Sequence, residues 1–434
     1  MDPRSNPYSP GAGVRPVELV GRDSEIQAFE ILRARAVAGR PAQSLVFYGL
    51  RGVGKTVLLN ELYVQALDSD WIVAKIEADL GSDRTPFRNQ VAGALNQSLR
   101  QTQTRGIPGR FVKRVLQTFR SFSLTASPDG SFSVGIDIDP AHGRADTGSI
   151  VADLSDLAID LAQAAREISV GAALFIDEMQ HLSVEELGAI CQASHEASQR
   201  NLPFYIIGTG LPNLPGLLAE AKSYSERLFN YSRIDRLNEV DSMTALLSPA
   251  KDEGVEWGAE AAQFVLKAAG GYPYFIQQFG QTTWNEATGS PIDAVDAVSG
   301  VRTGWDLLDA GFFRARWERA TPAQRNYLSA MSADGDGPSS TGEIAMRLGK
   351  KQASLGPIRA GLIFKGLVYA PEHGLVAFTV PGMANFISRQ ALSWVAHCRH
   401  LRITPVEIEQ RDPDRPHCRP HISPTPRDQT DTIP

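Results

Sequence analysis

The stretch that decides the fold is Gly49-Leu50-Arg51-Gly52-Val53-Gly54-Lys55-Thr56. It follows the apolar run 45–48, which has strand character, and the chain continues from Val57 with the apolar spacing of a helix. A Gly-x-x-x-x-Gly-Lys-Thr loop between a strand and a helix has the spacing of a phosphate-binding loop, the Walker A motif. Its glycines let backbone N–H groups turn towards phosphate oxygens at a helix N-terminus. The sequence therefore predicts that residues 49–57 hold the phosphates of ATP.

A second motif supplies the acidic side chains that such a site needs. The run Leu174-Phe175-Ile176-Asp177-Glu178 is an apolar strand that ends in two carboxylates. We expect Lys55 to neutralise the β- and γ-phosphates, and Thr56 and Asp177 to hold Mg²⁺. Glu178 is predicted to polarise the attacking water, which indicates hydrolysis as well as binding. The alternative is that the two acids only cap the N-terminus of the helix that follows.

The order of elements along the chain predicts an α/β fold. Strands are expected at 45–48, 71–76, 172–176 and 204–207, with helices between them, and this alternation favours a parallel sheet covered by helices on both faces. An insertion at about 103–147 interrupts the alternation. Its first part is basic, and Phe122, Leu124 and the apolar positions 132–138 predict a β-hairpin in its second part.

The predicted domains follow from these shifts in pattern. Residues 1–16, rich in Pro, Gly and Ser, are expected to be a flexible lead-in, and residues 396–434 a disordered tail. Between them we expect a P-loop core at 17–236, a helical lid at 237–318 and a winged helix-turn-helix domain at 319–395.

The bulk composition fits a soluble globular protein. The chain has 434 residues, 42% of them hydrophobic and 21% charged, and a formal net charge of −6, so any contact with nucleic acid needs a local basic patch. The three cysteines are scattered and show no metal-ligand spacing. No run reaches the length of a membrane span and no apolar leader is present, so we expect a cytoplasmic protein without a membrane partner.

Taken together, the motifs resemble the AAA+ ATPases of the archaeal-ATPase or origin-recognition-like type, which are related to the signalling (STAND-like) P-loop NTPases. The resemblance covers about residues 17 to 385. Besides the two motifs above, it rests on four pieces of sequence: Val20-Gly21-Arg22-Asp23-Ser24-Glu25, Gly208-Thr209-Gly210, Ser225-Glu226-Arg227-Leu228-Phe229 and Gly270-Gly271-Tyr272-Pro273-Tyr274-Phe275.

The resemblance implies roles for residues outside the phosphate loop. Val20 and Gly21 would border the adenine, and Thr209 would contact the γ-phosphate or the water as a sensor, unless it only satisfies the end of its strand. Arg227 would be an arginine finger for a neighbouring subunit, or simply a solvated helix residue. Pro273 would pack near the adenine, start the lid helix, or do both. No arginine occupies the usual sensor position in the lid.

The pattern at 319–395 resembles a winged helix-turn-helix. A local basic cluster surrounds the turn and the presumed recognition helix of this module. We expect the following residues there to contact double-stranded DNA: Lys350, Lys351, Gln352, Ser354 and Arg359. The alternative is that the module docks a protein partner.

Two hypotheses follow from this sequence. The first is an ATPase whose nucleotide state controls DNA binding or assembly through the winged helix. The second is a signalling or partner-loading ATPase whose winged helix binds protein. In either case we expect ATP and Mg²⁺ as ligands and a homo-oligomer at least in the ATP-bound form.

Overall fold

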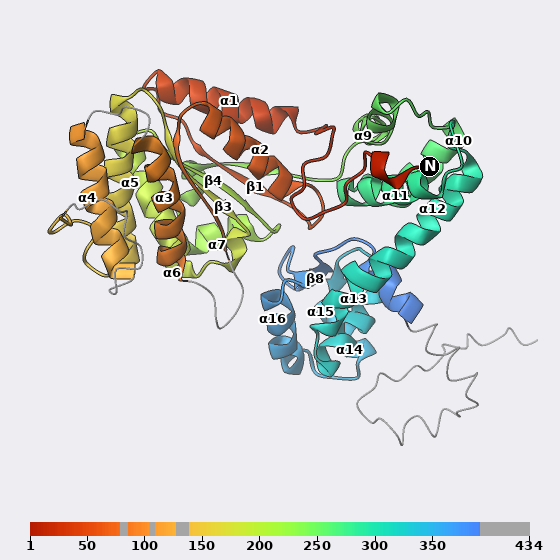
Figure 1. The fold of residues 1–434 in the computed structure, drawn as a ribbon. Coiled ribbons are helices and arrows are strands. Elements are labelled where there is room, and N and C mark those ends of the chain that lie inside the picture. The colour runs from red at the N-terminus through yellow and green to blue at the C-terminus, as the bar shows by residue number, and fades with distance from the viewer. Residues whose placement is uncertain (79–85, 104–108, 127–138, 391–434) are drawn as a thin grey trace, which may run out of the picture. The chain divides into compact units, whose positions relative to one another are not determined.

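The computed structural model of the protein describes residues 1–78, 86–103, 109–126 and 139–390 (Figure 1). The chain divides into two compact units. The first consists of residues 1–312, 369–371 and 379–381, and the second of residues 313–368, 372–378 and the described residues from 382 onward. No helix within the described ranges is long and apolar enough to cross a membrane.

A five-stranded sheet forms the centre of the first unit. Its strands are β1 (Ser44–Tyr48), β2 (Ile72–Glu77), β3 (Ala172–Asp177), β4 (Phe204–Gly210) and β5 (Phe229–Arg233). Their order across the sheet is β2-β3-β4-β1-β5, and every neighbouring pair is parallel. The carboxyl ends of all five strands therefore meet at one edge, where a ligand site is expected in this architecture.

Helices cover both faces of this sheet (Figure 1). One face is covered by α1 (Asp23–Val37) and α2 (Lys55–Asp68), and the other by α3 (Phe87–Gln103), α4 (Gly109–Ala126), α5 (Ile150–Glu167), α6 (Val184–Gln199) and α7 (Leu214–Ala221). Successive strand residues point to opposite faces, so Leu45 and Phe47 pack with α1 and α2 while Val46 joins the other cluster. This arrangement confirms the predicted α/β sheet.

The insertion differs from the hairpin that the sequence predicts. Phe122 and Leu124 lie in the helix α4, in which Val115, Leu116, Phe119 and Phe122 are all buried. A spacing of three and four residues is that of a helix face, and the apparent alternation near Phe122 is part of it. The rest of the predicted hairpin, at 127–138, lies outside the described residues.

The acids of α5 hold the basic segment of the insertion against the core. Arg114 forms an ion pair of 3.0 Å with Asp160, whose side chain is fully buried. Arg144 and Thr118 bond to the same carboxylate at 3.0 and 2.6 Å. A buried carboxylate must be paired to be tolerated, so Arg114 has a structural role in this segment.

The lid consists of α9 (Glu239–Asp252), α10 (Ala259–Ala269), α11 (Pro273–Glu286) and α12 (Ala294–Leu307). The first nine residues of the chain pack on it, which differs from the flexible lead-in expected from their composition. Tyr8 is 2% exposed, lies edge-on to the rings of Trp257 and Trp284, and accepts a 3.0 Å hydrogen bond from the Trp257 indole. One large aromatic side chain thus anchors a segment whose other residues offer little apolar area.

The second unit has the winged helix-turn-helix pattern. Its elements are α13 (Arg314–Glu318), α14 (Pro322–Ser332), β6 (Ser339–Ser340), α15 (Thr341–Arg347), the 3₁₀ turn η4 (Gln352–Leu355), α16 (Gly356–Phe364), β7 (Val368–Tyr369) and β8 (Leu375–Phe378). The strands form a small sheet in the order β6-β8-β7. The helices and the β pair confirm the predicted fold class, and the tail predicted at 396–434 lies outside the described residues.

The docking of the amino-terminal segment gives a first prediction. We expect Tyr8→Ala to lower the free energy of unfolding by about 3–5 kcal/mol, because it empties a buried aromatic site. Tyr8→Phe should cost only about 1–3 kcal/mol, since it removes a hydroxyl and leaves the Trp257 N–H unpaired. Urea denaturation followed by tryptophan fluorescence measures both. Val14→Ala, at a position 48% exposed, is the control. An unchanged midpoint for Tyr8→Ala would show that the segment does not dock.

Candidate nucleotide-binding site

The backbone of the phosphate loop requires its glycines. The loop joins β1 to α2, and Gly52 and Gly54 adopt φ angles of 84° and 92°, which side chains disfavour. Gly49 has no room for a side chain, because a Cβ atom there would lie 2.0 Å from the carbonyl oxygen of Ile234. The loop that the sequence predicts is therefore present, at the start of a helix whose first N–H groups have no partner within that helix.

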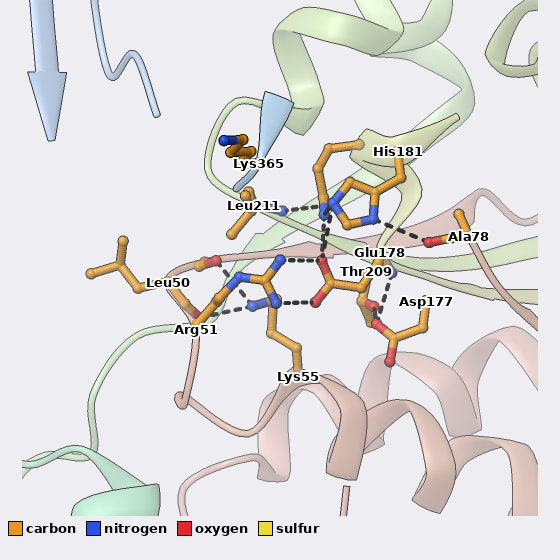
Figure 2. A network of polar contacts seen from close by, with 12 residues as sticks. Leu50, Arg51, Lys55, Ala78, Asp177, Glu178, His181, Thr209, Leu211 and Lys365 are labelled. Carbon is orange, nitrogen blue, oxygen red and sulfur yellow. Dashed lines mark hydrogen bonds and ion pairs between the residues drawn. The ribbon is translucent and has the colours of Figure 1, made fainter. Parts of the chain in front are cut away.

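Lys55 is the first residue of α2 and is only 7% exposed. Its Nζ donates hydrogen bonds to the carbonyl oxygens of Gly49 at 3.0 Å and Leu50 at 2.8 Å, so the ammonium is folded onto its own loop. Burial lowers the pKa of Lys55 to about 8, an effect that Glu178 and Asp177 partly oppose and Arg51 reinforces. Figure 2 shows Lys55, Asp177 and Glu178 in the same part of the structure, within electrostatic reach of one another.

Asp177 ends β3 and is buried. Its Oδ1 accepts a 2.9 Å hydrogen bond from the backbone N–H of Glu178 and another from the hydroxyl of Thr209 (Figure 2). Thr209 belongs to β4, which lies between β3 and β1 in the sheet. The predicted sensor threonine therefore reaches the predicted metal-binding carboxylate, and a buried carboxylate at this edge of the sheet suits a divalent cation.

Glu178 follows β3 directly and carries an unusual backbone conformation. Its φ and ψ angles are 52° and 39°, in the left-handed region that non-glycine residues rarely adopt. Its carboxylate pairs with both terminal nitrogens of Arg51, each at 3.1 Å (Figure 2). Strained conformations of this kind cluster at functional sites. The sequence predicts Glu178 as part of the site but gives Arg51 no contact with it.

Arg22 is a residue of the site that sequence reasoning missed. It is 7% exposed, and its guanidinium donates to the carbonyl oxygens of Gly21 at 2.6 Å, Val53 at 2.8 Å and Asp235 at 2.8 Å. Burial lowers the pKa of this guanidinium. Arg22 thus fixes the segment that contains Val20 and Gly21 against the phosphate loop. The sequence did offer one signal for this role, because Arg22 is the basic residue within the segment Val20–Glu25.

The start of the lid helix also contacts the loop. Pro273 is the first residue of α11, as one of the two sequence interpretations expects, and the next residue, Tyr274, donates its backbone N–H to the carbonyl oxygen of Gly52 at 3.3 Å. The structure therefore brings Pro273 next to the loop. Its contact with an adenine stays a prediction.

Arg227 lies away from this edge of the sheet. It belongs to the short helix α8 (Ser225–Leu228), immediately before β5, whose first residue pairs with Ser44 at the start of β1. Arg227 is exposed at this amino edge, where it lines a pocket with Arg40 and Arg166. It does not join the site of its own chain, and its role as a finger for another subunit stays a prediction.

The residues predicted to contact DNA fall into two groups in the second unit. Lys350 and Lys351 lie between α15 and η4, and both are exposed, as is Ser354, whose hydroxyl bonds to the carbonyl oxygen of Lys351 at 2.7 Å. Gln352 and Arg359 have partners inside the unit, a hydroxyl on α15 at 2.7 Å and a backbone carbonyl of β8 at 3.2 Å. The two lysines are therefore the residues best placed to meet a phosphate backbone.

Comparison with known proteins finds matches for two parts of the chain. Residues 18–207 match the family described as AAA ATPase domain, and residues 310–387 match a domain of unknown function. The Walker-type ATPase of Pyrococcus abyssi has a similar structure, with a TM-score of 0.55 at 15% identity, over 86% of this chain and 97% of that one. This likeness shows a shared fold.

Two further solved structures are similar at lower scores. The Orc1 protein of Aeropyrum pernix, solved in complex with DNA, gives a TM-score of 0.43 at 16% identity over 86% of this chain and 94% of that one. The RuvB Holliday junction branch migration motor of Thermotoga maritima gives 0.42 at 14% identity over 84% and 96%. No curated protein sequence matches the chain.

The buried Lys55 predicts a pH dependence of phosphate binding. Its pKa of about 8 means that the free protein loses this proton as the pH rises through 8, whereas a bound polyphosphate favours the charged form. The affinity for a non-hydrolysable ATP analogue should therefore fall above pH 8, approaching about tenfold per pH unit. Binding at pH 9 should take up nearly one proton. Calorimetry in two buffers of different ionisation enthalpy measures this uptake, and its absence at pH 9 would contradict the assignment.

Proposed function

We propose that the protein binds and hydrolyses ATP with Mg²⁺, and the match of residues 18–207 to the family described as AAA ATPase domain supports this proposal. The observation that carries the proposal is the grouping of Lys55, Asp177 and Glu178 at the carboxyl edge of the sheet. In the proposed reaction the loop N–H groups and Lys55 bind the phosphates, and Thr56 and Asp177 hold the metal ion. Bound Mg²⁺ supplies charge neutralisation at the phosphate oxygens.

Glu178 has the role of orienting and polarising water. A carboxylate next to the metal-binding acid is suited to accept a proton from water as it attacks. Thr209 holds Asp177 in position through the hydroxyl contact described above. The hydroxyl of Thr209 also gives this edge of the sheet a polar group that can respond to a terminal phosphate. Arg227, exposed at the other edge, is proposed to act only on a neighbouring subunit.

Two substitutions separate binding from hydrolysis. Lys55→Ala should abolish nucleotide binding, because the loop loses its only buried ammonium. Glu178→Gln should still bind ATP but hydrolyse it about 10²–10⁴-fold more slowly, as expected for loss of a general base. Phosphate release under single-turnover conditions and equilibrium binding of a fluorescent ATP analogue measure the two properties. Unchanged turnover in Glu178→Gln would remove this residue from the reaction.

We further propose that the nucleotide state controls DNA binding through the winged helix. The support is local charge, since Lys350 and Lys351 are exposed in a chain whose formal net charge is −6. Arg347, in the same cluster, is paired with Asp334 at 2.6 Å and contributes less free charge. The two lysines precede α16, the presumed recognition helix, where a phosphate contact would set its register on a duplex.

A second candidate function is supported by exposed apolar side chains in the same unit. Met346 on α15 and Phe364 on α16 are 75% and 64% exposed. Large apolar side chains at these positions suit a protein partner better than a phosphate backbone. A signalling or partner-loading ATPase would use this surface in place of DNA contact.

A salt series distinguishes the two candidates. If the lysines contact phosphates, Lys350→Glu/Lys351→Glu should weaken binding to duplex DNA in the presence of ATP and lower the salt slope by about 2. The matched control is Lys251→Glu/Lys267→Glu, which makes the same charge change at exposed positions of the lid. Fluorescence anisotropy between 50 and 200 mM salt measures both. Absence of DNA binding by the unmodified protein at low salt would favour the protein-partner function.

A further inference from the structure

Both oxygens of the Glu178 carboxylate are occupied by partners of the same chain. Arg51 donates Nη1 to Oε1 and Nη2 to Oε2, each at 3.1 Å, in a two-point contact (Figure 2). The side-chain amide of Gln180 donates a further hydrogen bond to Oε2. Three hydrogen bonds from its own chain thus occupy a carboxylate that has about four acceptor positions. The described conformation therefore holds Glu178 away from the water that it would polarise.

The arrangement is braced from the neighbouring strand. Gln180 accepts a 2.9 Å hydrogen bond at Oε1 from the backbone N–H of Leu211, directly after β4. Gly210 leaves room for this contact, because a Cβ atom there would lie 2.8 Å from the same oxygen. The partner amide is thus fixed to the strand that carries Thr209. Glu178 is held from one side by a rigid strand end and from the other by a residue of the phosphate loop.

Arg51 differs from Gln180 in its position. It lies in the phosphate loop, four residues before Lys55, and the Lys55 ammonium bonds at 2.8 Å to the carbonyl oxygen of Leu50, the residue directly before Arg51. A guanidinium binds phosphate oxygens in the same two-point geometry that it uses here for a carboxylate. One guanidinium fork cannot do both at once. A bound triphosphate and Glu178 therefore compete for Arg51.

We propose that Arg51 is a nucleotide-responsive clamp on Glu178. Without a triphosphate it pairs with the carboxylate and keeps it from water, and with a triphosphate bound it turns to the terminal phosphate and frees the carboxylate. Arg51 acts here as a positioning residue for Glu178. The inference rests on the proposed ATP hydrolysis and assigns its control to a single ion pair, 25% and 16% exposed at its two side chains.

The clamp predicts a coupling between the two residues that depends on the nucleotide. In the free protein the ion pair must be broken before a triphosphate gains Arg51, so Glu178→Gln should tighten binding of a non-hydrolysable ATP analogue. The same substitution in an Arg51→Met background has no ion pair to release. Across the four proteins of this cycle we expect a coupling of about three- to tenfold for the analogue, within the range measured for contacting pairs. ADP has no terminal phosphate to compete, so its coupling should stay within about twofold.

The experiment is equilibrium titration of the full chain and its three variants with the analogue and with ADP, both with Mg²⁺. Arg51→Met should keep a measurable, Lys55-dependent affinity for ADP, which checks that the loop is intact. If it does not, Arg51→Lys repeats the cycle with the positive charge kept and the fork removed. Gln180→Met, which removes the neutral contact on the same carboxylate, is the control and should leave the preference for the analogue over ADP unchanged.

The outcomes separate this proposal from the one on which it rests. Coupling for the analogue and none for ADP supports the clamp. Equal coupling for both ligands, or none for either, overturns it, because Arg51 would then brace Glu178 regardless of the nucleotide. If the unmodified protein binds and hydrolyses ATP in a Lys55-dependent way, only the clamp is overturned by such a result. If the unmodified protein binds neither ligand, the proposed function itself fails.

Discussion

The rest of the site depends on the burial of one charged group, the ammonium of Lys55. An ionised lysine that is 7% exposed would be costly without partners, and its desolvation is opposed by two carbonyl oxygens of its own loop. The loop provides those carbonyls because its glycines adopt left-handed φ angles. The two neighbouring acids then have a cation to balance. Because this balance is internal, contacts within the loop hold it around Lys55, and a bound phosphate would take over contacts of this kind.

The order of the strands in the sheet places the phosphate loop and the two carboxylates at the same edge. Because β4 lies between β1 and β3, the phosphate loop and the two carboxylates come from strands that are not direct neighbours, and the gap between them is filled by Thr209. A buried threonine hydroxyl in a strand end would need an acceptor in any case, and here the acceptor is Asp177. The hydrogen bond between the two strand ends thus does two things: it satisfies the buried Thr209 hydroxyl, and it fixes the direction of the Asp177 carboxylate.

The sequence predicted the fold closely wherever the apolar pattern of a segment and the length of that segment indicated the same element. Four of the five sheet strands, the helices on both faces and the winged helix were expected, because apolar periodicity and the glycine spacing are local signals. The fifth strand, β5, was not expected, since Asn230, Ser232 and Arg233 give it little apolar pattern. The errors came where a local signal was ambiguous. Phe122 and Leu124 alternate like strand residues, yet Phe119 and Phe122 form a helix face with the residues before them. The short lead-in appeared unable to fold, and only contact with Trp257 and Trp284 across the chain explains its placement.

The candidate site was predictable in its members but not in its contacts. Walker spacing identifies Lys55, Thr56 and Asp177 because the chemistry requires those residue types at those places. The pairing of Arg51 with Glu178 depends on a side chain reaching across the sheet edge, which no spacing encodes. Gln180 and Arg22 were missed for the same reason, since each bonds to backbone far away in the sequence.

The same long-range contacts explain how a small change at the loop can be felt elsewhere in the first unit. Three elements bond to consecutive parts of the loop: the Glu178 segment through Arg51, the lid through the Gly52 carbonyl, and the segment before α1 through the Val53 carbonyl. A ligand bound at this loop lies close to all three contacts, because they share one short stretch of backbone. The contact to Glu178 is the one made by a charged, two-point side chain that has an alternative partner in a phosphate. The backbone contacts of the lid and of Arg22 lack such an alternative, so they stay in place and fix the loop against which Arg51 turns.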